Sequence, residues 1–186
     1  MGRRIVISLV LLLVVGGAYV WFSLTPNEQV NLEASADIAA ISDRLDAARA
    51  ANLPVSLSGS EVKALAVEAI KAAKIDDRIK GIDVKLGQNS ITVALAVDIG
   101  SKVVAVSAEA SPVITADQLT IDLESARVGA VPVPMSEVMK RFGDALPSGV
   151  TLEGGRLTID LSVGAFDNMQ LDTLAIENGT LKLQTK

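Results

Sequence analysis

Cysteine and histidine are both absent from this chain of 186 residues. Without cysteine no disulfide can staple the fold and no lipidated N-terminal cysteine can anchor it, so the fold must be stabilised by burial. Without histidine the chain lacks the usual proton shuttle and the commonest metal ligand. These absences exclude much chemistry, and we expect a protein that is not an enzyme and that has no catalytic residue, metal site or cofactor.

Aromatic residues make up only 3% of the sequence. Tyr19, Trp21 and Phe22 lie close together near the N-terminus, which leaves Phe142 and Phe166 for the rest of the chain. So few rings cannot form stacking platforms for bases. The excess of 22 Asp and Glu over 17 Lys and Arg also repels nucleic acid. We therefore expect no nucleic-acid partner.

One uncharged apolar run, Ile5 to Leu24, follows directly behind Arg3 and Arg4. A helix of about 20 residues spans about 30 Å, the thickness of a bilayer's hydrocarbon core. The two arginines favour a cytoplasmic N-terminus, and the aromatic rings near the far end favour the membrane interface. The run predicts a single-pass anchor in the cell membrane, with the C-terminal domain extracytoplasmic and the membrane itself as a partner.

Two other interpretations of this run compete with the anchor. The small residues Gly16 to Ala18 are typical of a cleavage site, which would make the run a removable signal peptide. Cleavage there would leave the apolar stub Tyr19 to Phe22 on a secreted domain. A buried core helix fits poorly, because the run has no polar face. Whether the anchor is cleaved stays open.

Three segments follow from the anchor prediction. Residues 1–24 form a cytoplasmic stub and the transmembrane helix, residues 25–53 a juxtamembrane linker with a spacer helix, and residues 54–186 one extracytoplasmic domain. The spacer helix is predicted because apolar residues recur every three to four positions. These residues are Ile38, Ile41, Leu45 and Ala48.

The domain after residue 54 combines helix and strand patterns. Ser58 to Glu61 has the capping-box sequence that begins a helix. From Gly81 the apolar period changes from three or four to two, which predicts antiparallel strands. Gly154-Gly155 and Asn178-Gly179 predict two hairpin turns. The expected fold class is α+β, with an N-terminal transmembrane helix followed by a sheet of about seven strands packed with two or three helices.

A third helix is predicted after Pro134, where Met135, Val138, Met139 and Phe142 recur at helical spacing. Met and Phe side chains adapt to irregular apolar ligands. These four residues are therefore the candidates for an apolar groove, although ordinary core packing explains the same stripe.

The segment Val128-Gly129-x-x-Pro132-x-Pro134, followed by that helix, is similar to the YpmS family of bacterial membrane-anchored proteins. The helix within Val55 to Ile70, the strand meander and the terminal strands extend the resemblance over residues 54–186. The helix within Asn31 to Ala51 departs from it. The family has no established biochemical activity, but its layout resembles lipid-cradling folds in which a long curved antiparallel sheet wraps a helix. The resemblance therefore implies a curved sheet and, by analogy alone, lipid binding.

Polar residues that suggest chemistry have simpler explanations. Ser136 and Lys140 lie one helical turn apart, but their spacing is four rather than that of an S-x-x-K motif. Asp98, Asp122 and Asp160 fall at the polar positions of strands, where alternation alone accounts for them.

The leading functional hypothesis is a membrane-anchored, extracytoplasmic, non-enzymatic protein that binds a lipid, an acyl chain or an apolar envelope ligand in a groove between sheet and helix. The alternative is a cell-envelope scaffold or accessory protein that recruits partner proteins. The sequence leaves open the ligand, the protein partners, the oligomeric state and whether such a groove is open.

Overall fold

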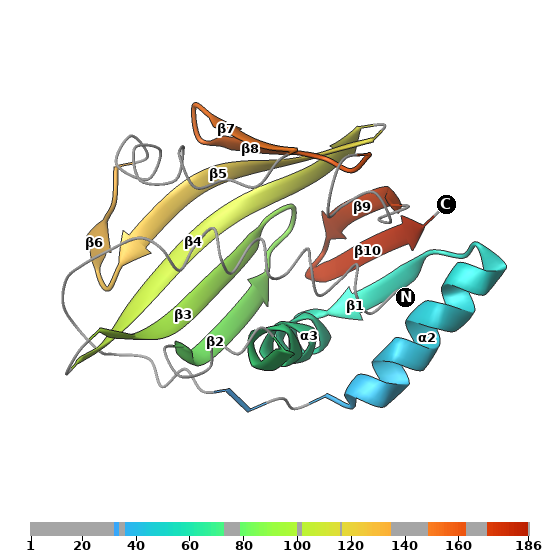
Figure 1. Ribbon diagram of the computed structural model, residues 1–186, viewed down its shortest axis with the longest axis horizontal. Coiled ribbons are helices and arrows are strands. Elements are labelled where there is room, and N and C mark those ends of the chain that lie inside the picture. Colours follow the sequence, from blue (N-terminus) through green and yellow to red (C-terminus); the bar gives the residue numbers. More distant parts are fainter. Residues whose placement is uncertain are drawn as a thin grey trace.

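The computed structural model describes residues 32–33, 36–72, 79–99, 102–115, 117–134, 149–162 and 171–185. This part of the chain has two helices, α2 (Ile38–Ala51) and α3 (Gly59–Ala72) (Figure 1). Its strands are β1 (Val55–Ser58), β2 (Ile79–Leu86), β3 (Ile91–Ile99), β4 (Lys102–Thr115), β5 (Gln118–Val128), β6 (Val131–Pro132), β7 (Val150–Glu153), β8 (Arg156–Asp160), β9 (Leu171–Glu177) and β10 (Thr180–Thr185).

The strands form two antiparallel sheets. The large sheet has seven strands in the order β2-β3-β4-β5-β8-β7, with the short β6 also paired to β5. The small sheet has three strands in the order β1-β10-β9, so that Val55 pairs with Leu183 near the C-terminus. In Figure 1 the long strands β4 and β5 extend well beyond the part of the large sheet that lies beside α3.

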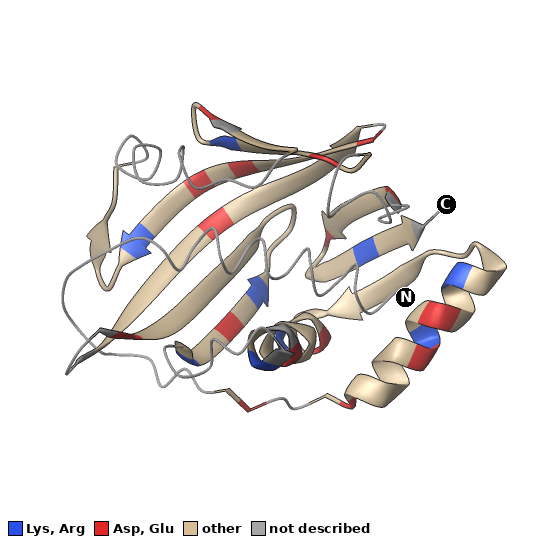
Figure 2. Ribbon diagram, in the orientation of Figure 1, with Lys and Arg blue, Asp and Glu red and all other residues tan. Residues whose placement is uncertain are grey.

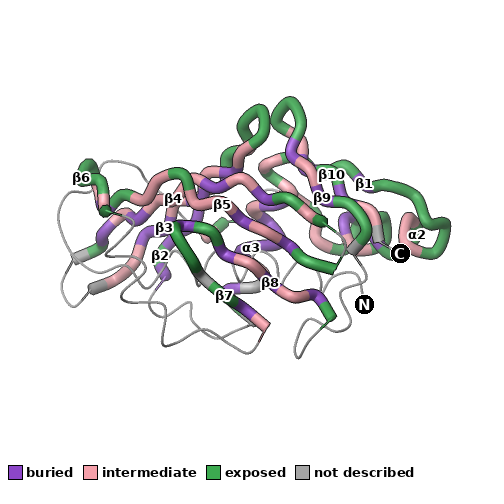
Figure 3. The backbone as a smooth tube through the Cα atoms, turned by 90° about the horizontal axis from the view of Figure 1, so that it is seen from above, coloured by how far each residue is buried: buried purple, intermediate pink, exposed green. Residues whose placement is uncertain are grey.

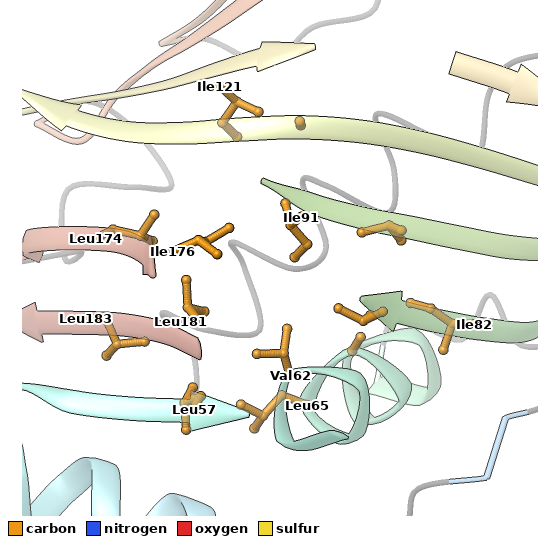
Figure 4. Close-up of a cluster of buried hydrophobic side chains, with 14 of the residues drawn as sticks. Leu57, Val62, Leu65, Ile82, Ile91, Ile121, Leu174, Ile176, Leu181 and Leu183 are labelled. Atoms are coloured by element: carbon orange, nitrogen blue, oxygen red, sulfur yellow. The ribbon is translucent and has the colours of Figure 1, made fainter. Parts of the chain in front are cut away.

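The main core lies between one face of the large sheet, the small sheet and α3. In the close-up of Figure 4, Val62 and Leu65 of α3 lie near Leu57 of β1 and Leu181 of β10. Ile121 of β5 enters the same cluster from the opposite side. We call the face of the large sheet that meets this core its inner face, and the opposite one its outer face.

Helix α3 begins as the capping-box sequence predicts. The backbone amide of Ser58 donates to Glu61 Oε2 at 2.8 Å, and the amide of Glu61 donates to Ser58 Oγ at 3.4 Å. Ala64 and Val67 of this helix are buried as well as Val62 and Leu65, because the helix lies against strands of both sheets.

The hairpin turns predicted at Gly154-Gly155 and at Asn178-Gly179 are both confirmed. Gly154 and Gly155 have φ of 58° and 86° between β7 and β8, while Asn178 and Gly179 have φ of 51° and 74° between β9 and β10. The second turn also joins the two sheets, because the Gly179 amide donates to the Gly87 carbonyl at 2.9 Å.

The predicted fold class and location need correction. The structure is mostly sheet, at 57%, whereas the prediction placed a transmembrane helix ahead of an α+β domain. None of the helices in the described ranges is long and apolar enough to cross a bilayer; α2 and α3 have 14 residues each. This finding contradicts both that fold class and the single-pass location in the cell membrane. The run Ile5 to Leu24, on which these predictions rested, lies outside the described residues.

Candidate functional site

A second cluster of buried apolar side chains adjoins the main core, and we call it the distal cluster. It contains the buried residues Val104, Val106 and Val128, against which Val97, Ala126 and Val133 pack. Seen from above in Figure 3, β6 and the neighbouring ends of β4 and β5 lie at one end of the molecule, and α2 lies at the other. The distal cluster therefore belongs to the end of the sheet that is remote from α2.

Strand register explains why these residues meet. Val97 of β3 pairs with Val104 of β4, and Val106 of β4 pairs with Val128 of β5. Partners in an antiparallel pair project to the same face of a sheet. Alternation along β3 puts Val97 on the same face as Leu95 of the main core, and Val97 packs against both clusters. The distal cluster thus continues the inner face beyond the main core.

The turn after β5 brings the last member into place. Gly129 has a φ of 59°, a conformation that glycine adopts readily, and its amide donates to the Ala105 carbonyl at 2.7 Å. The chain then returns along β5, and the amide of Val133 donates to the Ala126 carbonyl at 2.8 Å. Val133 thereby lies at the sheet edge beside Ala126.

The chemistry that the distal cluster offers is restricted. All its members are valine or alanine, so no side chain there can donate or accept a hydrogen bond. Contact with these residues is favourable only through burial of apolar surface and through dispersion. A molecule bound here would have to present hydrocarbon.

The residues predicted to line an apolar groove cannot be placed. Met135, Val138, Met139 and Phe142 lie outside the described residues, as do Ser136 and Lys140. The described chain stops at Pro134, next to Val133 of the distal cluster, and resumes at Gly149.

The strand aspartates are accounted for by local partners. Asp122 Oδ1 accepts from Arg156 Nε at 2.6 Å, and Asp98 lies 3.9 Å from the Lys80 ammonium group. The hydrogen bond from Arg156 to Asp122 raises the pKa of this arginine further. Among the described side chains, no group of three acidic, cysteine or histidine residues is arranged to hold a metal ion.

Asp160 ends β8 and makes a local turn. Its Oδ1 accepts from the hydroxyl of Ser162 at 2.6 Å and from the backbone amide of Ser162 at 2.9 Å. The hydroxyl bond, followed by the amide bond, lowers the pKa of this carboxyl. The geometry is that of a turn rather than of a catalytic pair.

Two serine–glutamate contacts on the large sheet were not predicted. Ser90 Oγ donates to Glu109 Oε1 at 2.9 Å, and Ser111 Oγ donates to Glu124. Figure 2 shows acidic positions on β4 and β5 and a basic position at the end of β5. The register shifts between Glu109 and Ala110, a β-bulge that places Glu124 opposite no single residue of β4. Simple alternation gives no signal for such a bulge.

No family model, curated protein or solved structure matches this chain. The resemblance to the YpmS family stays a prediction that rests on the quoted residues alone.

Proposed function

We propose that the protein is a non-enzymatic binding protein for an apolar ligand of the acyl-chain class, held against the distal cluster. The observation that carries this proposal is a second buried apolar cluster that continues the inner face beyond the main core. Domains usually have one contiguous core with smaller satellite clusters beside it, and ligand sites are lined mainly by apolar side chains.

The lining favours a flexible hydrocarbon chain over a flat ring system. Val104, Val106 and Val128 present short branched side chains, and no aromatic residue belongs to the cluster. Without aromatic faces or polar groups, stacking and hydrogen bonding add nothing to recognition. A methylene chain gains about 0.8 kcal/mol for each CH₂ that is buried, so several such groups give useful affinity.

The test uses a matched pair of alanines on the central strands of one sheet. Ala126 projects to the inner face beside the distal cluster, whereas Ala105 projects to the outer face opposite Ala96. Ala126→Leu adds bulk beside the distal cluster, and we expect it to weaken binding of a fluorescent fatty acid to the purified full chain by tenfold or more. Ala105→Leu should bind within about twofold of the parent.

Comparing Ala126→Leu with Ala105→Leu also corrects for fatty acid that adsorbs to apolar stretches elsewhere in the chain, because both variants share that background. Native mass spectrometry of the purified parent should show a retained lipid. Absence of any lipid, together with equal fatty-acid binding by both variants, would contradict the proposal. Stable protein partners in crosslinked cells, combined with that outcome, would favour the scaffold interpretation.

A further inference from the structure

Among the described strands, β1 lies at the edge of the small sheet. It pairs with β10 on one side, and its residues Val55 to Ser58 carry no charge. The Ser56 carbonyl accepts a hydrogen bond from Arg44. The amide of Ser58, the last residue of the strand, donates to Glu61. Because both backbone groups of a residue point to the same side of an antiparallel strand, Ser56 and Ser58 define the outer edge.

One ion pair closes this edge. Arg44 of α2 contacts Glu61 of α3 at 2.5 Å and reaches the Ser56 carbonyl at 3.5 Å. Figure 1 shows α2 running beside β1 on the side away from β10. Covering an edge with a helix and a charge is a common means of preventing unwanted strand pairing.

The attachment of α2 is slight compared with that of α3. Only Ile41 and Leu45 of α2 are buried. The buried side chains of α3 include Val62, Ala64, Leu65, Ala66, Val67 and Ile70. The hydroxyl of Ser42 is also buried without a hydrogen-bond partner, which opposes docking of α2.

The ends of α2 are closed by residues of its own segment. Asp37 Oδ1 accepts from the Ala39 amide at 2.9 Å, and Asn52 takes a left-handed conformation at φ 51° that ends the helix. At this end, the Asn52 carbonyl also accepts a 3.4 Å hydrogen bond from Gln184 Nε2 of the small sheet. The helix can therefore lift from the fold with little change in its own hydrogen bonds.

We propose that α2 is a strap that opens as a unit before the rest of the domain unfolds, and that its opening withdraws Arg44 and frees the outer edge of β1. The open form exposes the Ser56 carbonyl and the apolar stripe around Ile41 and Leu45. Opening is a conformational step that is separate from binding at the distal cluster.

Hydrogen exchange of the full chain, followed by NMR, tests the strap directly. Amides in the second half of α2 should exchange at a common rate at least tenfold faster than the slowest amides of α3, such as those of Val67 and Ile70. Arg44→Met removes the ion pair and keeps the aliphatic stem. It should accelerate exchange in α2 at least fivefold and leave α3 within twofold.

A matched control lies on the same helix. The Arg49 side chain, in the last turn of α2, makes no hydrogen bond or ion pair with another described side chain, so Arg49→Met should change exchange in α2 by less than about threefold, through the helix dipole alone. If Arg49→Met and Arg44→Met act equally, the ion pair is not a latch. If amides of α2 and α3 exchange at one rate in the parent, α2 opens only with global unfolding and the proposal is wrong.

Single-cysteine labelling gives a second readout, because the chain has no cysteine of its own. Leu45→Cys and Leu65→Cys place a thiol at two buried positions, 4% and 0% exposed, on α2 and α3. A strap predicts labelling of the first variant at least tenfold faster than the second under native conditions. Equal rates would overturn it.

Discussion

The carboxylate of Glu61 bonds both to Ser58, at the end of β1, and to Arg44 of α2. It accepts the Ser58 amide and hydroxyl on Oε2, and it meets Arg44 on Oε1. Burial raises the pKa of this carboxyl, but the Ser58 bonds and Arg44 outweigh burial and hold its pKa below the ordinary value. The charged form is therefore stabilised by folding.

This residue predicts a stability change in mild acid. A carboxyl whose pKa is lowered by folding contributes its full stabilisation above the unfolded pKa, near 4.5, and loses it as pH falls through the folded pKa. Urea unfolding midpoints should therefore decrease below pH 4.5. Glu61→Gln keeps an acceptor for the Ser58 amide and should cost about 0.5 to 1 kcal/mol at pH 7, with a flatter acid profile.

Folding shifts the pKa of Asp160 in the same direction, so this residue serves as the comparison. Its pKa is also lowered, by the Ser162 hydroxyl and amide, so Asp160→Asn should flatten part of the same acid profile. Of the two variants, Glu61→Gln should accelerate exchange in α2 and Asp160→Asn should not, because Glu61 contacts Arg44 and Asp160 lies on β8. An unchanged acid profile in both variants would show that neither carboxyl is linked to folding.

At the scale of elements, the hairpin between β9 and β10 depends on one glycine. Gly179 has a φ of 74°, and its amide donates to the Gly87 carbonyl of the β2–β3 turn. Gly179→Ala keeps the donor but forces a side chain into a conformation that costs about 1 kcal/mol or more. Calorimetry should show this loss, whereas Asn178→Gly should stay within about 0.5 kcal/mol of the parent.

Elements with strong local signals could be predicted from the sequence. The capping box of Ser58 and Glu61 and the Asn178-Gly179 turn are specified within four residues. β1 was not predicted: Val55 to Ser58 alternates apolar and polar residues, but four residues are too few to identify a strand, and its partner β10 lies at the far end of the chain. The bulge at Glu124 depends on the pairing of β4 with β5, which alternation within one strand does not encode.

The distal cluster, like the bulge, could not be predicted from the pattern within one strand. Val97, Val104, Val106 and Val128 each read as ordinary inward positions of a strand. Nothing within one strand shows that they gather beyond the main core, because their grouping depends on strand order, strand length and the return of the chain at Gly129. The sequence instead predicted a site at Met135 to Phe142, which lies outside the described residues.

At the scale of the whole molecule, the two sheets share one core and should unfold together. Leu57 of the small sheet and Ile121 of the large sheet are 0% and 1% exposed and belong to the same cluster. Leu57→Ala and Ile121→Ala should each cost about 2 to 5 kcal/mol. Both should keep a single calorimetric transition that coincides with loss of the far-ultraviolet circular dichroism of the strands.

The distal cluster supplies the control for this prediction. Val104→Ala removes a smaller group at the sheet's far end, so it should cost about 1 to 2 kcal/mol and leave the transition single. Two transitions in Leu57→Ala, one of them absent from Ile121→Ala, would show that the small sheet folds independently. In that case the bond from Gly179 to Gly87 and the packing of α3 against strands of both sheets would not be enough to couple the sheets. A single transition in all three variants means that the sheet that presents the distal cluster is supported by the whole fold.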